Sequence, residues 1–373
     1  MKEGWEYKKL GEVCNIDFGT RVVRSRDAGS IYPVYGGGGA TFKMDMYNRE
    51  DCMVISRFGM SEQCTRFVKG KFFLNDSGLT LSMKENCMIQ EFMDWQILYL
   101  NNTIYSLGRG AAQKNLDTKA LAEVRITYPN NLSEQQSIVD YLDSAFAKID
   151  AMKANAEKAL NEAKALFQAS LKEMLEPKEG WEEKTLKEVA KYRRGSFPQP
   201  YGNKEWYDGA GAMPFVQVAE LQEDSFDMIP VTKRRISKIA QPLSVFVPAG
   251  TVLVSLQGSI GKVAITNYDS YVDRTIAIFQ DYKISIDKTF FAYQLKIRFE
   301  IERIKARGTT IKTITKEEFA NFIINCPSLS EQQTIVDTLD SLKSKVDKLQ
   351  ENYDKISQEC DALKQAILRK VFE

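Results

Sequence analysis

Side chains that could perform acid–base, nucleophilic or metal chemistry are scarce in this sequence. It contains no histidine, and its six cysteines, at positions 14, 52, 64, 87, 326 and 360, form no Cys-x-x-Cys pair. Without histidine, the Ser–His, Cys–His and His–metal mechanisms are excluded. A zinc site would have to gather thiolates from distant segments, so we expect free thiols and no metal site. Carboxylate or lysine chemistry stays open.

Glycine-rich stretches invite comparison with nucleotide sites, but the required residues are missing. The glycines at 36–39 are not followed by Gly-Lys-Ser/Thr. The stretch 256–263 ends like a phosphate-binding loop, but it has Leu256 where that loop needs glycine and Val263 where it needs serine or threonine. The sequence also has no Pro-Pro dipeptide, which is part of the catalytic motif of adenine methyltransferases. It has no Pro-Asp dipeptide either, which is part of the simplest nuclease motif. We therefore expect a protein that is not an enzyme and binds no cofactor.

The polar side chains that remain are suited to binding. Arginine and lysine can hydrogen-bond to guanine edges, glutamine to adenine edges, and all of them to phosphates. For each candidate, a solvated surface charge is an equally good interpretation. Candidates beside Gly, Ser or an aromatic residue in predicted loops are Arg21, Arg24, Arg57, Arg109, Gln113, Lys114, Arg193, Arg194, Gln199, Gln257, Lys262, Arg307 and Lys312.

A repeat positions these candidates in two similar modules. Gly-Trp-Glu at 4–6 with Leu-x-Glu-Val at 10–13 recurs at 180–182 and 186–189, and Leu-Ser-Glu-Gln-Gln at 132–136 recurs at 329–333. Short β-branched runs such as 52–56 and 251–255 predict strands within each module. The boundaries that we expect are 1–132 for the first module, 133–177 for a helix, 178–329 for the second module and 330–373 for a second helix.

The two helices carry a heptad pattern. Ser133 with Gln136, and Ser330 with Gln333, fit capping boxes at their starts. An apolar stripe this narrow requires a helical partner, so we expect the two helices to pair antiparallel as a coiled coil. The alternative is that each helix packs on its own module. The predicted seam includes Ile138, Leu142, Ile149, Met152, Ile335, Leu339, Leu342, Val346, Leu349 and Ile356.

Charge follows the same division of the chain. Both helices are net acidic, whereas the whole chain has a formal net charge of +1, so the modules together are net basic. That excess is compatible with phosphate contact but is not specific to it. No apolar run is long enough to span a membrane, and no signal peptide is evident, so we expect a cytoplasmic protein.

The duplicated order of these motifs resembles the specificity subunit of type I restriction-modification enzymes, and the resemblance spans the whole chain. Two further segments fit the repeat. Residues 108–116 correspond to 306–314, and Ser-x-x-Gly at 56–59 corresponds to 255–258. The resemblance implies an α+β fold with two target-recognition domains, two long helices and an internal pseudo-twofold repeat.

The resemblance also implies a function. Each module would read one half of a bipartite, asymmetric site in double-stranded DNA, and the helices would set the spacing and dock two methylation subunits. Restriction subunits would complete the enzyme, and these partners would use S-adenosylmethionine, ATP and Mg²⁺. The alternative is a stand-alone bipartite DNA-binding protein whose helices self-associate. A scaffold that does not bind DNA is a third possibility. Co-purification with a methylation subunit and duplex binding distinguish the three.

Overall fold

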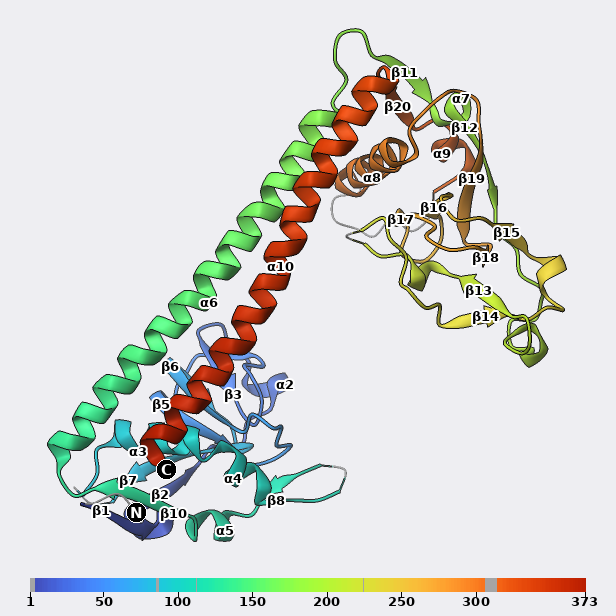
Figure 1. Cartoon of the computed structure of the whole chain (residues 1–373). Helices are drawn as coiled ribbons and strands as arrows, with labels where there is room; N and C mark the ends of the chain where they lie inside the picture. Colours follow the sequence, from blue (N-terminus) through green and yellow to red (C-terminus); the bar gives the residue numbers. More distant parts are fainter. Residues whose placement is uncertain (1–3, 85–86, 112, 224, 306–313) are drawn as a thin grey trace. The chain divides into compact units, whose positions relative to one another are not determined.

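The protein is described here by a computed structural model of residues 4–84, 87–111, 113–223, 225–305 and 314–373 (Figure 1). The chain forms two compact units. Unit 1 contains Met1–Lys158 and Asn352–Glu373, and unit 2 contains Ala159–Glu351. Each unit combines one β-rich module with parts of two long helices, α6 (Leu132–Leu175) and α10 (Leu329–Phe372).

The first module is built on a six-stranded sheet of order β2-β7-β5-β6-β3-β4. A ladder of β1 and β10 joins the start of the module to its end, and β8 pairs with β9 in a short hairpin. The elements are β1 Trp5–Lys9, α1 Leu10–Val13, β2 Cys14–Phe18, α2 Arg24–Asp27, β3 Tyr32–Tyr35, β4 Lys43–Met44, β5 Arg49–Ser56, β6 Thr65–Leu74, β7 Gly78–Met83, α3 Gln90–Tyr99, α4 Asn101–Ser106, β8 Gly108–Arg109, β9 Asn115–Leu116, α5 Thr118–Ala122 and β10 Arg125–Pro129.

The second module has two four-stranded sheets, of order β12-β19-β16-β17 and β14-β13-β18-β15. Its ends are joined by a ladder of β11 and β20, as β1 and β10 join the ends of the first module. The elements are β11 Glu182–Thr185, α7 Leu186–Val189, β12 Ala190–Arg194, β13 Met213–Val216, β14 Arg234–Ile236, β15 Val245–Val247, β16 Val252–Ser255, β17 Val263–Ile265, β18 Ser270–Val272, β19 Ile276–Tyr282, α8 Lys288–Lys305, α9 Lys316–Ala320 and β20 Ile323–Cys326, with 3₁₀ turns at Lys204–Trp206, Val218–Glu220 and Gln241–Leu243.

The repeated Leu-Ser-Glu-Gln-Gln motif fastens each long helix to its own module. The buried Gln135 side chain donates to the carbonyl of Pro129 (2.8 Å) and accepts from the backbone N–H of Ile89 (2.9 Å). Gln332 repeats both bonds, donating to Pro327 (2.9 Å) and accepting from Asp287 (2.8 Å). A buried amide must satisfy both its donor and its acceptor, so this glutamine fixes the angle at which the helix leaves the module.

The predicted capping boxes are wrong. Each helix begins one residue earlier than expected, at Leu132 and Leu329, so the predicted caps lie inside the first turn. At α6 the side chain of Asn131 accepts from the backbone N–H of Ser133 (2.9 Å), and at α10 the Ser328 hydroxyl accepts from Glu331 (3.3 Å). Asparagine and serine are favoured N-caps, and here they directly precede the motif.

The two long helices pair antiparallel within each unit (Figure 1). In unit 1, Asp150 of α6 pairs with Lys364 of α10, and Lys153 of α6 pairs with Asp361 of α10. The residue number rises along α6 while it falls along α10, so the helices are antiparallel. In unit 2, the ammonium of Lys164 donates to the side chain of Gln350 at 2.8 Å. These exposed polar contacts set the register, while the buried apolar residues beneath them supply most of the stability.

The predicted seam needs a correction at two positions. Ile138, Leu142, Ile149, Ile335, Leu339, Leu342, Val346 and Ile356 are buried or half-buried. Met152 and Leu349, however, are 59% and 37% exposed. On α6, Phe146, Leu160 and Phe167 are buried, whereas Met152 and Leu166 are exposed. The larger side chains bury more apolar area, and this decides which positions face the partner helix.

No helix of the described part of the chain is long and apolar enough to cross a membrane. All six cysteines belong to that part, and each is a free thiol. The same residues hold no cluster of three or more Cys, Asp or Glu side chains that could bind a metal ion.

Candidate nucleic-acid interface

A hydrogen-bonded turn at residues 75–78 organises one end of the sheet in the first module. Asn75 donates its backbone N–H to Tyr35 (2.8 Å), and its side chain accepts from the N–H of Ser77 (2.9 Å). The carbonyl of Ser77 in turn accepts from Arg57, which follows β5 (2.8 Å). At the same end, Phe18 of β2 pairs with Leu79 of β7. Three segments that are distant in sequence, those of Phe18, Tyr35 and Arg57, therefore meet at this turn.

Arg57 lies between two exposed aromatic rings at this end of the sheet. Its guanidinium carbon is 4.6 Å from the ring centre of Phe18 and 4.5 Å from that of Phe58. The rings are 46% and 38% exposed, so the arrangement lies at the surface. Cation–π contacts of this kind hold a guanidinium in place while leaving its N–H groups available.

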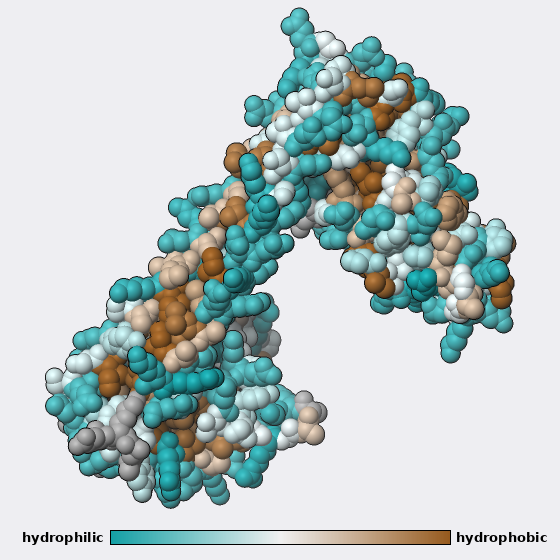
Figure 2. Space-filling view, in the orientation of Figure 1, coloured by the Kyte–Doolittle hydropathy of each residue, from teal (hydrophilic) through white to brown (hydrophobic). Residues whose placement is uncertain are grey.

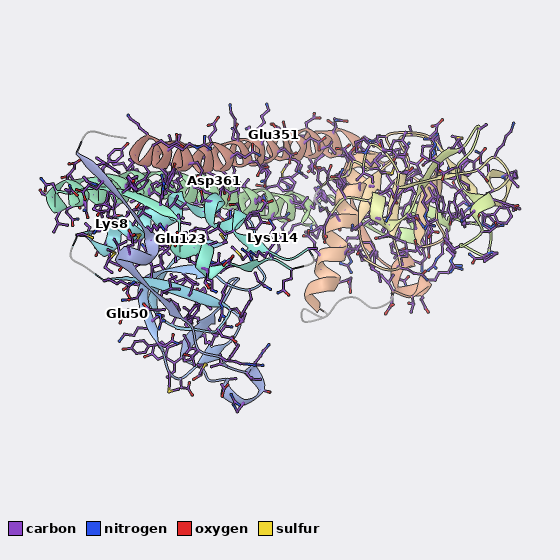
Figure 3. All side chains as sticks on the ribbon, turned by 90° about the horizontal axis from the view of Figure 1, so that it is seen from below. Lys8, Glu50, Lys114, Glu123, Glu351 and Asp361 are labelled. Carbon is purple, nitrogen blue, oxygen red and sulfur yellow. The ribbon has the colours of Figure 1, made fainter. Side chains whose placement is uncertain are left out.

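The β8–β9 hairpin lies beside Arg57 and brings further candidates to the same surface. The carbonyl of Arg57 accepts from Leu116 at 2.8 Å, and Lys114 accepts from Met60 at 3.0 Å. The Lys114 ammonium, labelled in Figure 3, sits 3.9 Å from the ring centre of Tyr105. Gln113 is exposed and its side chain borders Gly59. The structure therefore brings Arg57, Gln113 and Lys114 together.

Arg109 lies in the same hairpin, but its guanidinium forms an ion pair with Asp117. The pKa of the Asp117 carboxyl is lowered by the backbone N–H of Ala120 and by the Arg109 charge. The loop before α2 also starts at this end of the sheet, since Thr20 donates to the carbonyl of Leu74 at 3.0 Å. Two arginines of the loop and of α2, Arg21 and Arg24, are exposed.

The second module repeats the turn with different surface residues. Asp273 occupies the place of Asn75: its backbone donates to Val216 (2.9 Å), and its carboxylate accepts from the N–H of Thr275 (2.9 Å). The carbonyl of Thr275 accepts from Leu256 after β16 (2.8 Å), as that of Ser77 accepts after β5. The Ser-x-x-Gly correspondence predicted from the sequence therefore fits the backbone hydrogen bonds.

A glycine directly after β2 in the first module and directly after β12 in the second permits a close approach of two backbone segments. A Cβ at Gly19 would lie 1.9 Å from the carbonyl oxygen of Asn75, and one at Gly195 would lie 2.1 Å from that of Val272. Only glycine fits at such distances. The backbone N–H of Gly19 donates to the carbonyl of Gly78 in β7 (3.0 Å), and that of Gly195 donates to the carbonyl of Ile276 in β19 (3.1 Å).

Arg274 is the functional candidate that the sequence reasoning missed. It is exposed, and its guanidinium carbon lies 5.4 Å from the ring centre of Tyr201. The Tyr201 hydroxyl donates to the buried carboxylate of Asp273, which holds the ring in place. Burial and this carboxylate raise the pKa of the Tyr201 hydroxyl. An Asp followed two residues later by Thr, like Asn75 and Ser77, is the sequence signal for this turn.

The remaining candidates of the second module lie in different settings. Gln257 is exposed at the tip of the turn after β16, and Gln199 is exposed in the loop that leads to Tyr201. Lys262 is half-buried, and its ammonium donates to the carbonyl of Leu221 at 2.9 Å, a contact within the fold. Arg307 and Lys312 lie outside the described residues.

Arg193 and Arg194 are both exposed on β12, an edge strand that pairs only with β19 among the described strands. Consecutive residues of a strand point to opposite faces of the sheet. The two arginines therefore present their charges on opposite sides. Arg194 is the nearer to the turn, because it directly precedes Gly195.

Comparisons with known proteins agree with the duplicated fold. Residues 2–162 and 178–358 match the family model described as type I restriction modification DNA specificity domain. The type I restriction enzyme EcoBI specificity subunit of Escherichia coli is 24% identical over 289 residues. That alignment covers 69% of this chain and 60% of the relative, so the chain spans less than two thirds of the relative's length.

Solved structures show the same architecture. A chain from a type I R-M system has a TM-score of 0.75 at 18% identity and covers 100% of this chain and 98% of its own length. The HsdS subunit from Thermoanaerobacter tengcongensis has a TM-score of 0.54 at 19% identity, with coverage of 100% and 97%. The fold class expected from the sequence, two α+β modules with two long paired helices, is confirmed.

Proposed function

The chain belongs to the family of type I restriction-modification DNA specificity domains, and from this premise we propose that it is the non-catalytic subunit that selects the DNA sequence. Each module reads one half of a bipartite, asymmetric site in double-stranded DNA. The proposed surface of the first module is formed by Arg57, Gln113 and Lys114, with Arg21 and Arg24 beside it. The surface of the second is formed by Arg194, Gln199, Gln257 and Arg274.

One observation supports two separate readers above all others. The same turn, at the same end of the central sheet, is built with the same backbone hydrogen bonds in both modules, while the exposed residues differ. Phe58 in the first module corresponds to Gln257 in the second, and Asp76 corresponds to Arg274. A constant frame with different polar groups reads different bases, because base edges are distinguished by their donors and acceptors. The target is therefore asymmetric.

The helices provide the platform for partners in this proposal. Large apolar side chains stay exposed on them, among charged residues that also line the helix surface (Figure 2). Partner binding buries apolar side chains of this kind where they gather into a patch. We assign this surface to two methylation subunits, with restriction subunits added in the complete cytoplasmic enzyme. Those partners supply the chemistry with S-adenosylmethionine, ATP and Mg²⁺. The exposed residues are Leu132, Tyr141, Met152, Leu166, Leu329, Leu349 and Leu363.

The proposal is tested by selecting sequences bound by the full-length chain from a random duplex library. We expect one motif with two specified halves and a fixed gap. Exchanging residues 180–328 for the equivalent module of a relative should change one half and leave the other intact. A change in both halves at once would contradict separate reading by the two modules.

The oligomeric state separates the alternatives. Light scattering of the purified chain, alone and with a type I methylation subunit from the same host, should give a monomer and then a complex with two methylation subunits. A stable dimer of the chain that excludes the methylation subunit would favour the self-associating DNA-binding protein instead.

A further inference from the structure

Resting on the proposed function, we propose that each module reads a guanine with one arginine held on an aromatic ring, Arg57 in the first module and Arg274 in the second. Both guanidinium groups lie over aromatic faces at the surface, with Phe18 and Phe58 around Arg57 and Tyr201 beneath Arg274. A side chain held in this way loses less conformational freedom when it binds, which favours specific contacts over loose charge attraction.

The donors of these two guanidinium groups are available to a ligand. Within the described part of the chain, neither forms a hydrogen bond or an ion pair. Three other arginines of the first module use their donors within the fold. Arg49 donates to Thr80 at 3.0 Å, Arg66 donates to the carbonyl of Gly37 at 2.8 Å, and Arg109 is paired with Asp117. Stacking engages the face of a guanidinium, so the N–H groups around its edge stay unpaired.

The two arginines belong to the same pair of hydrogen-bonded turns in the two modules, although each comes from a different turn of the pair. Arg57 follows β5, and its N–H is bonded to Ser77 of the neighbouring turn. Arg274 lies in that neighbouring turn of the second module, one residue before Thr275, which accepts from Leu256 after β16. The paired turns thus carry one stacked arginine in each module. Its return from a different sequence position points to a shared task.

Guanine is the base that matches a guanidinium. Arginine offers donors and no acceptor. In the major groove guanine presents two acceptors, N7 and O6, whereas adenine presents one acceptor beside a donor that opposes the second N–H. A phosphate contact also uses arginine donors, but it carries no sequence information. The two cases differ in what happens to sequence preference when the arginine is removed.

The test is a random-duplex selection with the full-length chain, followed by affinity measurements on the selected site and on point-changed duplexes. Wild type should select at least one guanine in each half. Arg57→Ala should abolish the preference at one base pair of one half and weaken binding to the selected site by about 5- to 150-fold. Arg274→Ala should do the same in the other half only.

Two kinds of variant separate reading from charge. Arg57→Lys and Arg274→Lys keep the charge but lose the fork, so they should lose base preference and retain binding to unrelated DNA. Phe58→Ala should weaken the preference at the same base pair as Arg57→Ala. Lys148→Ala, which removes an exposed charge from α6, is the control and should leave the selected motif unchanged.

Each outcome has a distinct meaning, provided that melting by circular dichroism shows the variants to be folded. Uniformly weaker binding with an unchanged motif would make the arginines phosphate contacts, which overturns this inference and leaves the proposed function standing. Loss of preference at a base pair other than G·C would also overturn it. A wild-type chain that selects no motif would overturn the proposed function as well.

Discussion

Asp94 is a carboxylic acid enclosed in the core of the first module. It is 7% exposed, and burial raises its pKa to about 7. One carboxylate oxygen accepts from the side chain of Gln90 at 2.9 Å. The folded protein therefore holds a proton that the unfolded chain releases at lower pH. The free energy of unfolding should fall as pH rises from about 4 to about 7 and then level off.

Asp94→Asn tests this pH dependence, because asparagine keeps the shape and the acceptor and cannot ionise. We expect the variant to melt several degrees above wild type at pH 8, with a difference that shrinks as the pH is lowered towards 4. Glu179→Gln, at an exposed position between the modules, is the matched control and should show no such trend. Equal melting temperatures of Asp94→Asn and wild type at pH 8 would mean that the fold does not raise the pKa of Asp94.

At the level of single residues, the sequence predicted chemical types better than roles. It selected Arg57 as a candidate through its glycine and aromatic neighbours, and by the same criterion it selected Arg109 and Lys262. Their contacts with Asp117 and the Leu221 carbonyl form only when the chain folds back on itself. Arg274 was missed for the same reason, since the ring that supports it, Tyr201, belongs to a different loop.

At the level of elements, the heptad pattern predicted the pairing of the two helices and all of the seam except Met152 and Leu349. The pattern contains two overlapping apolar stripes, and Lys153 interrupts the one that the structure buries. Periodicity alone therefore favoured the stripe through Met152. The buried stripe is the one with Phe146 and Leu160, because large side chains gain more from leaving water. The repeat, in contrast, predicted the duplicated modules correctly.

A pair of substitutions on α6 measures the difference between the two stripes. Leu142 is fully buried and Met152 is 59% exposed. Leu142→Ala should lower the free energy of unfolding by about 2–5 kcal/mol, whereas Met152→Ala should change it by no more than about 0.5 kcal/mol. Urea unfolding followed by circular dichroism provides both values. A comparable loss at Met152 would return it to the predicted seam.

At the level of the whole molecule, the proposed function requires the length of the two helices to set the gap between the two half-sites. Each is 44 residues long, about 66 Å at 1.5 Å per residue. Inserting seven residues into both, beside Lys158 and Glu351 where the two units divide, lengthens the spacer by about 10 Å and preserves the heptad seam. The preferred gap should grow by up to about three base pairs at 3.4 Å each, with both half-site sequences unchanged.

The same random-duplex selection measures the gap. An insertion in α6 alone is the control, because it shifts α6 against α10 and should cost stability without giving a new defined gap. The added base pairs also rotate one half-site by roughly a third of a turn, so affinity is expected to fall. A folded double insertion that keeps the original gap would show that the helices do not set the spacing.

The glutamine contacts at the start of each long helix have a consequence for inheritance. The groups that the Gln135 side chain hydrogen-bonds belong to residues 87, 89 and 129, and those that the Gln332 side chain hydrogen-bonds belong to residues 287 and 327. Each fastening is therefore encoded in one continuous stretch of the gene. A crossover at the repeated motifs transfers a module together with these glutamine contacts, whereas its packing against the other long helix, through Leu368 and Phe372 of α10 for the first module, is made with the recipient chain. New target sequences can then arise in a single genetic event that keeps the start of each long helix fastened to its module.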